Sequence, residues 1–303
     1  MKANGPSLQA RILELVFRLG RARKGFETPE GLRAAVAAAR PAGSVPTREL
    51  RRHFCITESS CAGRPLFTLS PRDRAASLLV LYLHGGAYVY EMNDGLWAML
   101  GKILERANAE CAVPLYPLAP EHRCTEVLAH ALEVYHAVRV AANGKPVVVL
   151  ADSAGGGLAL ALDRHLRGSG EPQPDGLVLI SPWLDATCAD PRQEEAAHLD
   201  PLLAIPGLRE AGRMYAGDLS PADPRVSPLF GDLGALPPTL VLTGTHDLLN
   251  ADARRLHALA NSSSLMTSEY PGALHVFPKT SIPEARHAVK EIVAFFDRVA
   301  LGP

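Results

Sequence analysis

The sequence predicts an α/β protein in which a mostly parallel sheet of about eight strands is covered by helices on both faces. Short apolar runs that are typical of buried strands alternate with helical segments along residues 78–301, which is the pattern of a parallel sheet. Two alternating segments ahead of this stretch predict an antiparallel pair that opens the sheet. Polar or glycine-rich segments follow several strands, at the edge where such sheets place their sites.

Two helices are expected before any strand. Residues 8–19 place Leu8, Ile12, Leu15, Val16 and Leu19 at helical spacing, with charged residues between them, so this segment predicts an amphipathic helix. Pro29 opens a second, alanine-rich helix that should end before Pro41. An ordinary surface helix pair and a lid over a site both remain open for these two helices.

The remaining elements follow from apolar runs and their periodicity. The segment 190–232 is rich in Pro and Gly and indicates an insertion rather than core. The expected strands are 53–57, 65–69, 78–83, 112–116, 147–150, 177–180, 239–242 and 266–270, and the expected later helices are 95–109, 127–142, 158–162, 199–215, 252–260 and 283–301.

Composition excludes several classes of protein. The 303 residues are 47% hydrophobic and 21% charged, with a formal net charge of −1, so no long-range field attracts nucleic acid or an anionic membrane, and a small uncharged partner is expected. No apolar run is long enough to span a bilayer. Charged residues interrupt the N-terminal apolar segment, so no signal peptide is predicted and a cytoplasmic location is expected. Five scattered cysteines without a C-x-x-C pair suggest neither a zinc site nor disulfides.

The segment 147–162, VVVLADSAGGGLALAL, predicts a serine nucleophile. Ser153 is expected on a tight turn between a buried strand and a helix, and only small side chains fit two residues before and after it. The helix that follows points its free N–H groups at the same place and would stabilise an anion. The alternatives are a glycine-rich strand-to-helix turn that only packs tightly, without a catalytic role, and a dinucleotide-binding turn. The second fails because Leu160 stands where that fingerprint needs Gly or Ala, and no acidic residue closes a second strand.

A serine needs a base, and the base needs an acid to orient it. In this fold class the chain order is Ser, acid, His, and Asp247 followed by His275 satisfies it. Asp252 is a second candidate for the acid. His257 and His287 are expected on helix surfaces, and His246 should face away from the site, so none of the three is expected to be the base.

Glycines follow the predicted strand at 78–83. Gly85 and Gly86 expose bare backbone N–H groups, as a hole for an oxyanion requires.

Four segments together resemble the hormone-sensitive-lipase family of α/β-hydrolases: His84-Gly85-Gly86-Ala87, Tyr116 to His122, Asp152-Ser153-Ala154-Gly155-Gly156, and Ser181 to Asp185. The resemblance covers about residues 75–300. It implies an α/β-hydrolase fold with a helical cap, and an esterase of short to medium acyl esters that needs no metal or organic cofactor. Carried onto this chain, it implies an oxyanion hole made by the N–H groups of Gly85, Gly86 and Ala154.

The resemblance also divides the chain. Residues 1–47 would be an N-terminal cap segment, residues 48–303 the catalytic domain, and residues 190–218 a second cap segment. Side chains that could line an acyl pocket are Tyr88, Trp183, Leu202, Leu203, Met214 and Phe277.

The chain departs from the family pattern at several positions. Ala87 and Ala151 replace glycines, Arg123-Cys124-Thr125 replaces Pro-Phe-Pro, and no proline follows Asp247.

An amidase or formamidase with the same triad remains the main alternative function, and a non-catalytic ligand-binding protein is a weaker one. A monomer and a homodimer both remain open.

Overall fold

An eight-stranded sheet forms the centre of the protein. In the computed structural model, which describes residues 5–39, 45–260 and 263–302, the strand order is β1-β2-β4-β3-β5-β6-β7-β8. β2 is antiparallel to both of its neighbours, and all other pairs are parallel. The predicted sheet is confirmed. The strands are β1 (Phe54–Cys61), β2 (Arg64–Pro71), β3 (Leu78–Leu83), β4 (Ala109–Pro114), β5 (Val147–Asp152), β6 (Gly176–Ile180), β7 (Thr239–Gly244) and β8 (Leu265–Tyr270).

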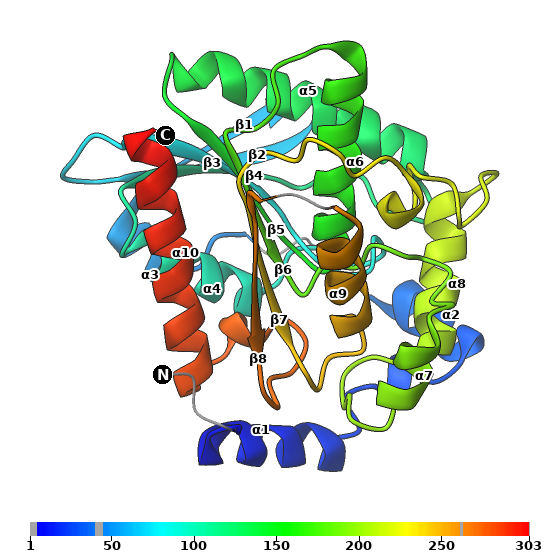
Figure 1. Cartoon of the computed structure of the whole chain (residues 1–303). Coiled ribbons are helices and arrows are strands. Elements are labelled where there is room, and N and C mark those ends of the chain that lie inside the picture. The colour runs from blue at the N-terminus through cyan, green and yellow to red at the C-terminus, as the bar shows by residue number, and fades with distance from the viewer. Residues whose placement is uncertain (1–4, 40–44, 261–262, 303) are drawn as a thin grey trace.

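Helices cover both faces of the sheet (Figure 1). Side chains of β5 alternate between two cores: Val147 and Val149 pack toward α5 and α6, whereas Val148 and Leu150 pack toward α4 and α10. Burial on both faces explains why the central strands are continuous apolar runs. The helices that flank the sheet are α3 (Arg48–His53), α4 (Asp94–Leu104), α5 (Cys124–Ala142), α6 (Ala154–Ser169), α9 (Asn250–Leu259) and α10 (Pro283–Leu301).

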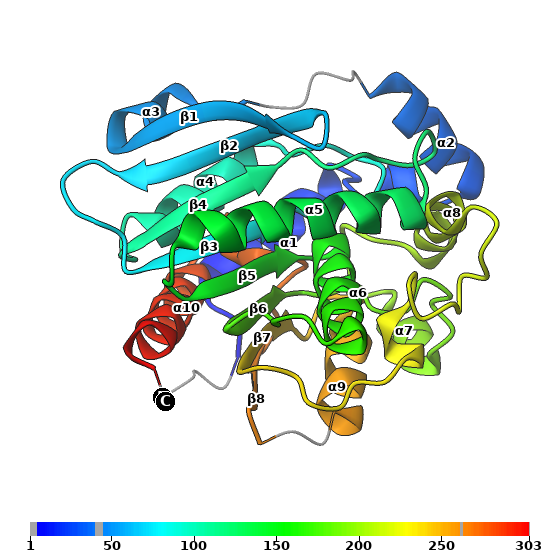
Figure 2. The same cartoon turned by 90° about the horizontal axis from the view of Figure 1, so that it is seen from above.

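Two segments far apart in sequence pack together outside the sheet. Helix α2 (Pro29–Ala38) lies beside α8 (Ile205–Ala216) in both views (Figures 1 and 2), and Arg33 forms an ion pair with Glu210 at 2.7 Å. The contact is close because α8 has a glycine at this point. A Cβ on Gly207 would lie 2.5 Å from the Cα of Phe26, in the short helix η1 (Lys24–Phe26).

Helix α1 (Leu8–Leu19) begins as predicted, with the Ser7 side chain accepting the N–H of Ala10. The orientation of its apolar stripe was not predictable from periodicity. All five side chains of that stripe point to solvent, between 53% and 76% exposed, and the helix instead packs through Ala10, which is buried.

Some element boundaries differ from the predictions. Strand β4 begins at Ala109, three residues before the predicted start, and α4 ends at Leu104 rather than at 109. The helix predicted from residue 199 begins only at Ile205. The reason is a turn in which Asp200 Oδ1 accepts the N–H groups of Leu202 and Leu203. Two six-residue helices were not predicted, α3 and α7 (Pro191–Ala196).

Candidate active site

Ser153 occupies a strained turn between β5 and α6. Its backbone has φ 50° and ψ −120°, a combination that residues other than glycine rarely adopt. Two hydrogen bonds hold it there: the Ser153 N–H donates to the carbonyl of Ile180, and its carbonyl accepts the N–H of Trp183, both at 2.9 Å. The turn therefore fixes Ser153 at the carboxyl edge of the sheet.

The small residues around the serine are required by packing. A Cβ on Gly155 would lie 2.0 Å from the carbonyl oxygen of Leu83, so no other residue fits without moving β3. Ala151 is completely buried, and its methyl group is accommodated. The predicted size limit two residues either side of Ser153 thus corresponds to real contacts with the neighbouring strand.

Ser153, His275 and Asp247 form one chain of hydrogen bonds. His275 Nε2 lies 2.9 Å from Ser153 Oγ, and His275 Nδ1 lies 3.1 Å from each oxygen of Asp247. Ser153 and His275 are each 7% exposed and Asp247 is 0% exposed. The Leu249 N–H also donates to Asp247 Oδ1 at 2.9 Å. The structure brings the three predicted side chains together, and all three are buried.

Asp252, the second candidate for the acid, holds a different part of the protein. Its Oδ2 accepts the N–H groups of Leu184 and Asp185 at 2.8 and 3.0 Å, and its Oδ1 accepts Gln193 Nε2 at 3.2 Å. Complete burial raises the pKa of Asp252 to about 8. The hydrogen bond to His275 belongs to Asp247, so Asp252 is wrong as the acid.

The three other histidines near or after Asp247 also have partners away from the serine. His246 Nδ1 lies 3.1 Å from Glu14 Oε2 on α1. His257 contacts Thr267, and His287 lies beside Glu291 on α10. Both helical histidines are exposed, as predicted.

The glycines after β3 take separate roles. The Gly85 N–H donates to Asp152 Oδ1 at 2.9 Å, so the predicted use of Gly85 as an oxyanion donor is contradicted. Within the residues described, no hydrogen bond occupies the N–H of Gly86 or of Ala154. Gly86, Ala87 and Tyr88 have consecutive positive φ angles of 123°, 53° and 63°. Ala87 adopts this left-handed turn at a conformational cost of about 1–2 kcal/mol.

Three motif residues to which the sequence assigned no role of their own, Asp152, Tyr116 and His84, support this loop. Asp152 accepts the Tyr82 hydroxyl at 2.6 Å as well as Gly85, and its position directly before Ser153 was the signal that could have identified it. The ring of Tyr116 stacks on His84 with centroids 4.2 Å apart and donates its hydroxyl to the His84 carbonyl at 2.5 Å. Burial lowers the pKa of His84 to about 4, which keeps that ring neutral near pH 7.

A second carboxylate lies next to the acid. Asp200 is completely buried, and its Oδ2 accepts the N–H of Leu248, the residue after Asp247, at 2.8 Å. Burial, together with the nearby charge of Asp247, raises the pKa of Asp200 to about 6. Because Asp200 Oδ1 also orders the turn before α8, this side chain joins the 190–218 segment to the loop of the acid.

The six predicted pocket residues divide between the two cores. Tyr88, Trp183 and Leu203 are buried on the α5–α6 side, the side of the 190–218 segment, and Leu202 and Met214 pack there half-buried. Tyr88 stacks on Tyr215 with centroids 3.5 Å apart. Phe277 is wrong as a pocket residue, because it packs on Tyr270 in the other core, under α4 and α10.

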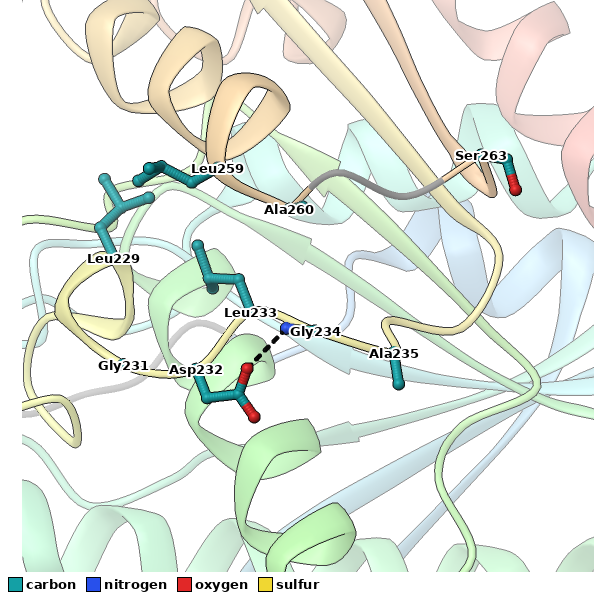
Figure 3. Close-up of a pocket in the computed structure, with 9 residues that line it drawn as sticks. All are labelled: Leu229, Gly231, Asp232, Leu233, Gly234, Ala235, Leu259, Ala260 and Ser263. Atoms are coloured by element: carbon teal, nitrogen blue, oxygen red, sulfur yellow. Dashed lines mark hydrogen bonds between the residues drawn. The ribbon is translucent and has the colours of Figure 1, made fainter.

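A cavity of about 650 Å³ lies far from this chemistry (Figure 3). Its walls come from Leu229, from residues 231–235, and from Leu259, Ala260 and Ser263. These residues lie near the amino ends of β7 and β8, whereas the triad lies at the carboxyl ends. Its acidic residue, Asp232, is engaged by the Gly234 N–H and by Arg167. Among the described residues that line it, this cavity brings together no nucleophile and base.

Within residues 5–39, 45–260 and 263–302, no three His, Cys, Asp or Glu side chains are grouped to hold a metal ion. The five cysteines are free thiols. No helix in the described part of the chain is long and apolar enough to cross a membrane.

Comparison with known proteins agrees with this geometry. The family with the α/β hydrolase fold matches residues 80–279. The chain is 34% identical to an esterase of Acinetobacter venetianus, over 73% of this chain and 75% of that protein. The crystal structure of an esterase from the bacterial hormone-sensitive lipase family superimposes with a TM-score of 0.79 at 25% identity, covering 96% of this chain and 97% of that one. The chain belongs to the hormone-sensitive-lipase family of α/β-hydrolases.

The chain is also similar to an acetyl-hydrolase of Streptomyces hygroscopicus, with 32% identity over 74% of this chain and 76% of that protein. These relatives are named an esterase and an acetyl-hydrolase, and the protein is accordingly a carboxylic ester hydrolase. The family resemblance drawn from the four sequence motifs is confirmed.

Proposed function

We propose that this protein is a serine esterase that cleaves carboxylic esters of short to medium acyl chain through an acyl-enzyme on Ser153. The observation that carries the proposal is the chain of hydrogen bonds from Ser153 Oγ through His275 to Asp247. This arrangement lets a weak hydroxyl nucleophile lose its proton to a positioned base as it attacks.

In the first half-reaction, Ser153 Oγ attacks the ester carbonyl while His275 Nε2 takes the hydroxyl proton. Asp247, at 3.1 Å from Nδ1, orients the ring and stabilises the imidazolium that forms. His275 then gives the proton to the alcohol oxygen as the C–O bond breaks. Water repeats the sequence on the acyl-enzyme and releases the carboxylic acid.

The negative charge that develops on the carbonyl oxygen needs preorganised donors. We assign this role to the N–H groups of Gly86 and Ala154, which are free of other partners among the described residues. Ala154 is also the first residue of α6, whose positive dipole end supports an anion at this place. Gly85 instead positions the loop through Asp152.

An acyl chain would lie between the catalytic edge and the 190–218 segment, where Leu203 is buried and Leu202 and Met214 are half-buried. Each substrate methylene buried there contributes up to about 0.8 kcal/mol. This environment favours an uncharged acyl group over a charged one. One relative is named an acetyl-hydrolase, which is consistent with a short acyl chain.

A panel of nitrophenyl esters from acetyl to decanoyl, tested beside the matching nitroanilides, examines this proposal. We expect kcat/KM to be highest between acetyl and hexanoyl and to be far lower for every anilide. A profile that favours the anilides would make the protein an amidase with the same triad. If the protein hydrolyses neither the esters nor the anilides, the proposal is overturned.

A further inference from the structure

Helix α1 carries apolar side chains on two opposite faces. Toward the protein it presents Ala10, which is buried, with Leu13 and Phe17 half-buried. A surface helix of a globular protein normally has one apolar stripe, and that stripe faces the core. The second stripe of α1 faces water. It consists of Leu8, Ile12, Leu15, Val16 and Leu19, which are 53–76% exposed.

This clustering is specific to α1. Among the described residues, eleven large hydrophobic side chains are exposed, and five of them lie on this one helix. The other six are scattered over separate elements. Single exposed hydrophobics are normal, whereas a contiguous stripe indicates a surface that binds something.

Helix α1 is fixed at the carboxyl edge of the sheet, the edge that carries the triad. Figure 1 shows α1 beyond the end of β8. Glu14 Oε2 lies 3.1 Å from Nδ1 of His246, the neighbour of Asp247, and the Arg18 guanidinium donates to the carbonyls of His198 and Leu199 at 3.0 and 2.8 Å. Because these bonds hold the inner side, the helix cannot roll its outer stripe inward without breaking them.

The charge around the stripe selects the kind of partner. Residues 8–28 contain five basic and two acidic side chains, a surplus of three positive charges in a chain whose net charge is −1. At helical spacing, Arg11 and Arg18 lie along one flank of the apolar stripe. Long arginine side chains beside an apolar face suit anionic lipid headgroups above an acyl layer. A two-fold contact through this stripe would instead bring two positive segments together.

We propose that α1 is an interfacial helix that docks the active-site edge of this protein on an anionic lipid surface. The apolar stripe enters the boundary between headgroups and acyl chains, and Arg11 on its flank remains among the headgroups, whereas the Arg18 guanidinium stays bound to the protein. With twelve residues the helix is about 18 Å long, so it lies in the interface and does not span it. Docking this edge would place the catalytic serine near esters that partition into lipid.

Co-sedimentation of the full chain with vesicles tests the proposal. One set of vesicles is phosphatidylcholine with an equal share of phosphatidylglycerol, and the other is phosphatidylcholine alone. We expect binding to the anionic vesicles that weakens as salt is raised and that is at least tenfold weaker on the neutral vesicles. The double variant Leu15→Ser/Leu19→Ser should lose at least a further tenfold on the anionic vesicles, and Arg11→Ser should reduce the salt dependence.

The matched control is Val140→Ser/Leu301→Ser, which removes two side chains that are 81% and 86% exposed on α5 and α10. It should bind like the unaltered chain. Equal loss in both double variants, or no binding to either vesicle by the unaltered chain, would overturn the proposal. So would a dimer in analytical ultracentrifugation that Leu15→Ser/Leu19→Ser converts to a monomer, because the occupant would then be a second copy. Hydrolysis of a soluble acetyl ester without vesicles reports separately on the proposed function and should be unchanged in all these variants.

Discussion

Asp247 and Asp252 belong to the same short stretch of chain, yet their carboxylates hold different groups. Asp247 accepts the imidazole of His275, whereas Asp252 accepts two backbone N–H groups at Leu184 and Asp185. The sequence alone does not distinguish them, because each is an aspartate that follows β7 within a few residues. Their division of roles depends on the direction of each side chain, which only the fold determines.

We predict that Asp247→Asn lowers kcat/KM by about four orders of magnitude, because the amide favours the wrong imidazole tautomer. Asp252→Asn should lower it less than tenfold. Its carbonyl can still accept from Leu184 and Asp185. Its NH₂ can donate to Gln193 Oε1, a buried atom without a partner among the described residues, once the Gln193 amide turns over to replace the Nε2 that faces Asp252. Steady-state kinetics on one soluble ester distinguishes the two. Reversed results would make Asp252 the acid.

The sequence predicted Ser153, Asp247 and His275, which the structure joins by hydrogen bonds, because each of them follows a recognisable strand. It assigned Gly85 wrongly because a glycine-rich turn does not reveal which N–H is already used, and here Asp152 uses it. It also missed Asp200, whose significance comes from a contact with Leu248 across the fold.

At the scale of elements, the contact between the N-terminal segment and α8 depends on the absence of a side chain at Gly207. A Cβ there would meet Phe26 backbone atoms at 2.5 and 2.6 Å. Backbone atoms cannot move aside cheaply, so a methyl group must push η1 and α8 apart.

Gly207→Ala should therefore displace the cap-like segments and lower kcat/KM for butyryl and hexanoyl esters more than for acetyl esters. The control is Gly168→Ala on α6, where a new Cβ would meet nothing within 4 Å. This control should leave the substrate profile unchanged and raise stability by up to about 1 kcal/mol. A uniform loss across the three esters in Gly207→Ala would indicate simple destabilisation rather than a cap over the acyl site.

Apolar periodicity predicted the strands and long helices well because those elements are buried on a defined face. It overran α4 and misplaced the start of α8, where local turns compete with the pattern. Periodicity also identified the stripe on α1 without indicating that it faces water, because the pattern carries no information about which partner covers it. The N-terminal segment 1–47 remains a predicted cap, and residues 1–4 and 40–44 of it lie outside the described residues.

At the scale of the whole molecule, the dependence of stability on pH reflects buried carboxyl groups. The unfolded Asp252 side chain loses its proton near pH 4, whereas the folded one keeps it to about pH 8. Over this interval the folded state binds more protons, so this group makes stability fall as the pH rises.

We predict that the Tm of the unaltered chain falls more between pH 5 and pH 8 than the Tm of Asp252→Asn. Asp232→Asn serves as the control, because Asp232 is on the surface and Arg167 lowers its pKa, which moves its titration away from this range. Thermal unfolding at several pH values measures all three proteins. Parallel curves for the unaltered chain and Asp252→Asn would show that Asp252 is ionised in the folded protein.

Labelling with a fluorophosphonate, followed by measurement of the intact mass, tests whether Ser153 is the nucleophile. We predict one adduct per chain, located on Ser153 by peptide mapping, with labelling at least a hundredfold slower in His275→Ala. Ser153→Ala should keep the Tm, take up no label and lose about a millionfold in ester turnover. An adduct on another residue, or near-normal turnover by a pure sample of Ser153→Ala, would contradict the account.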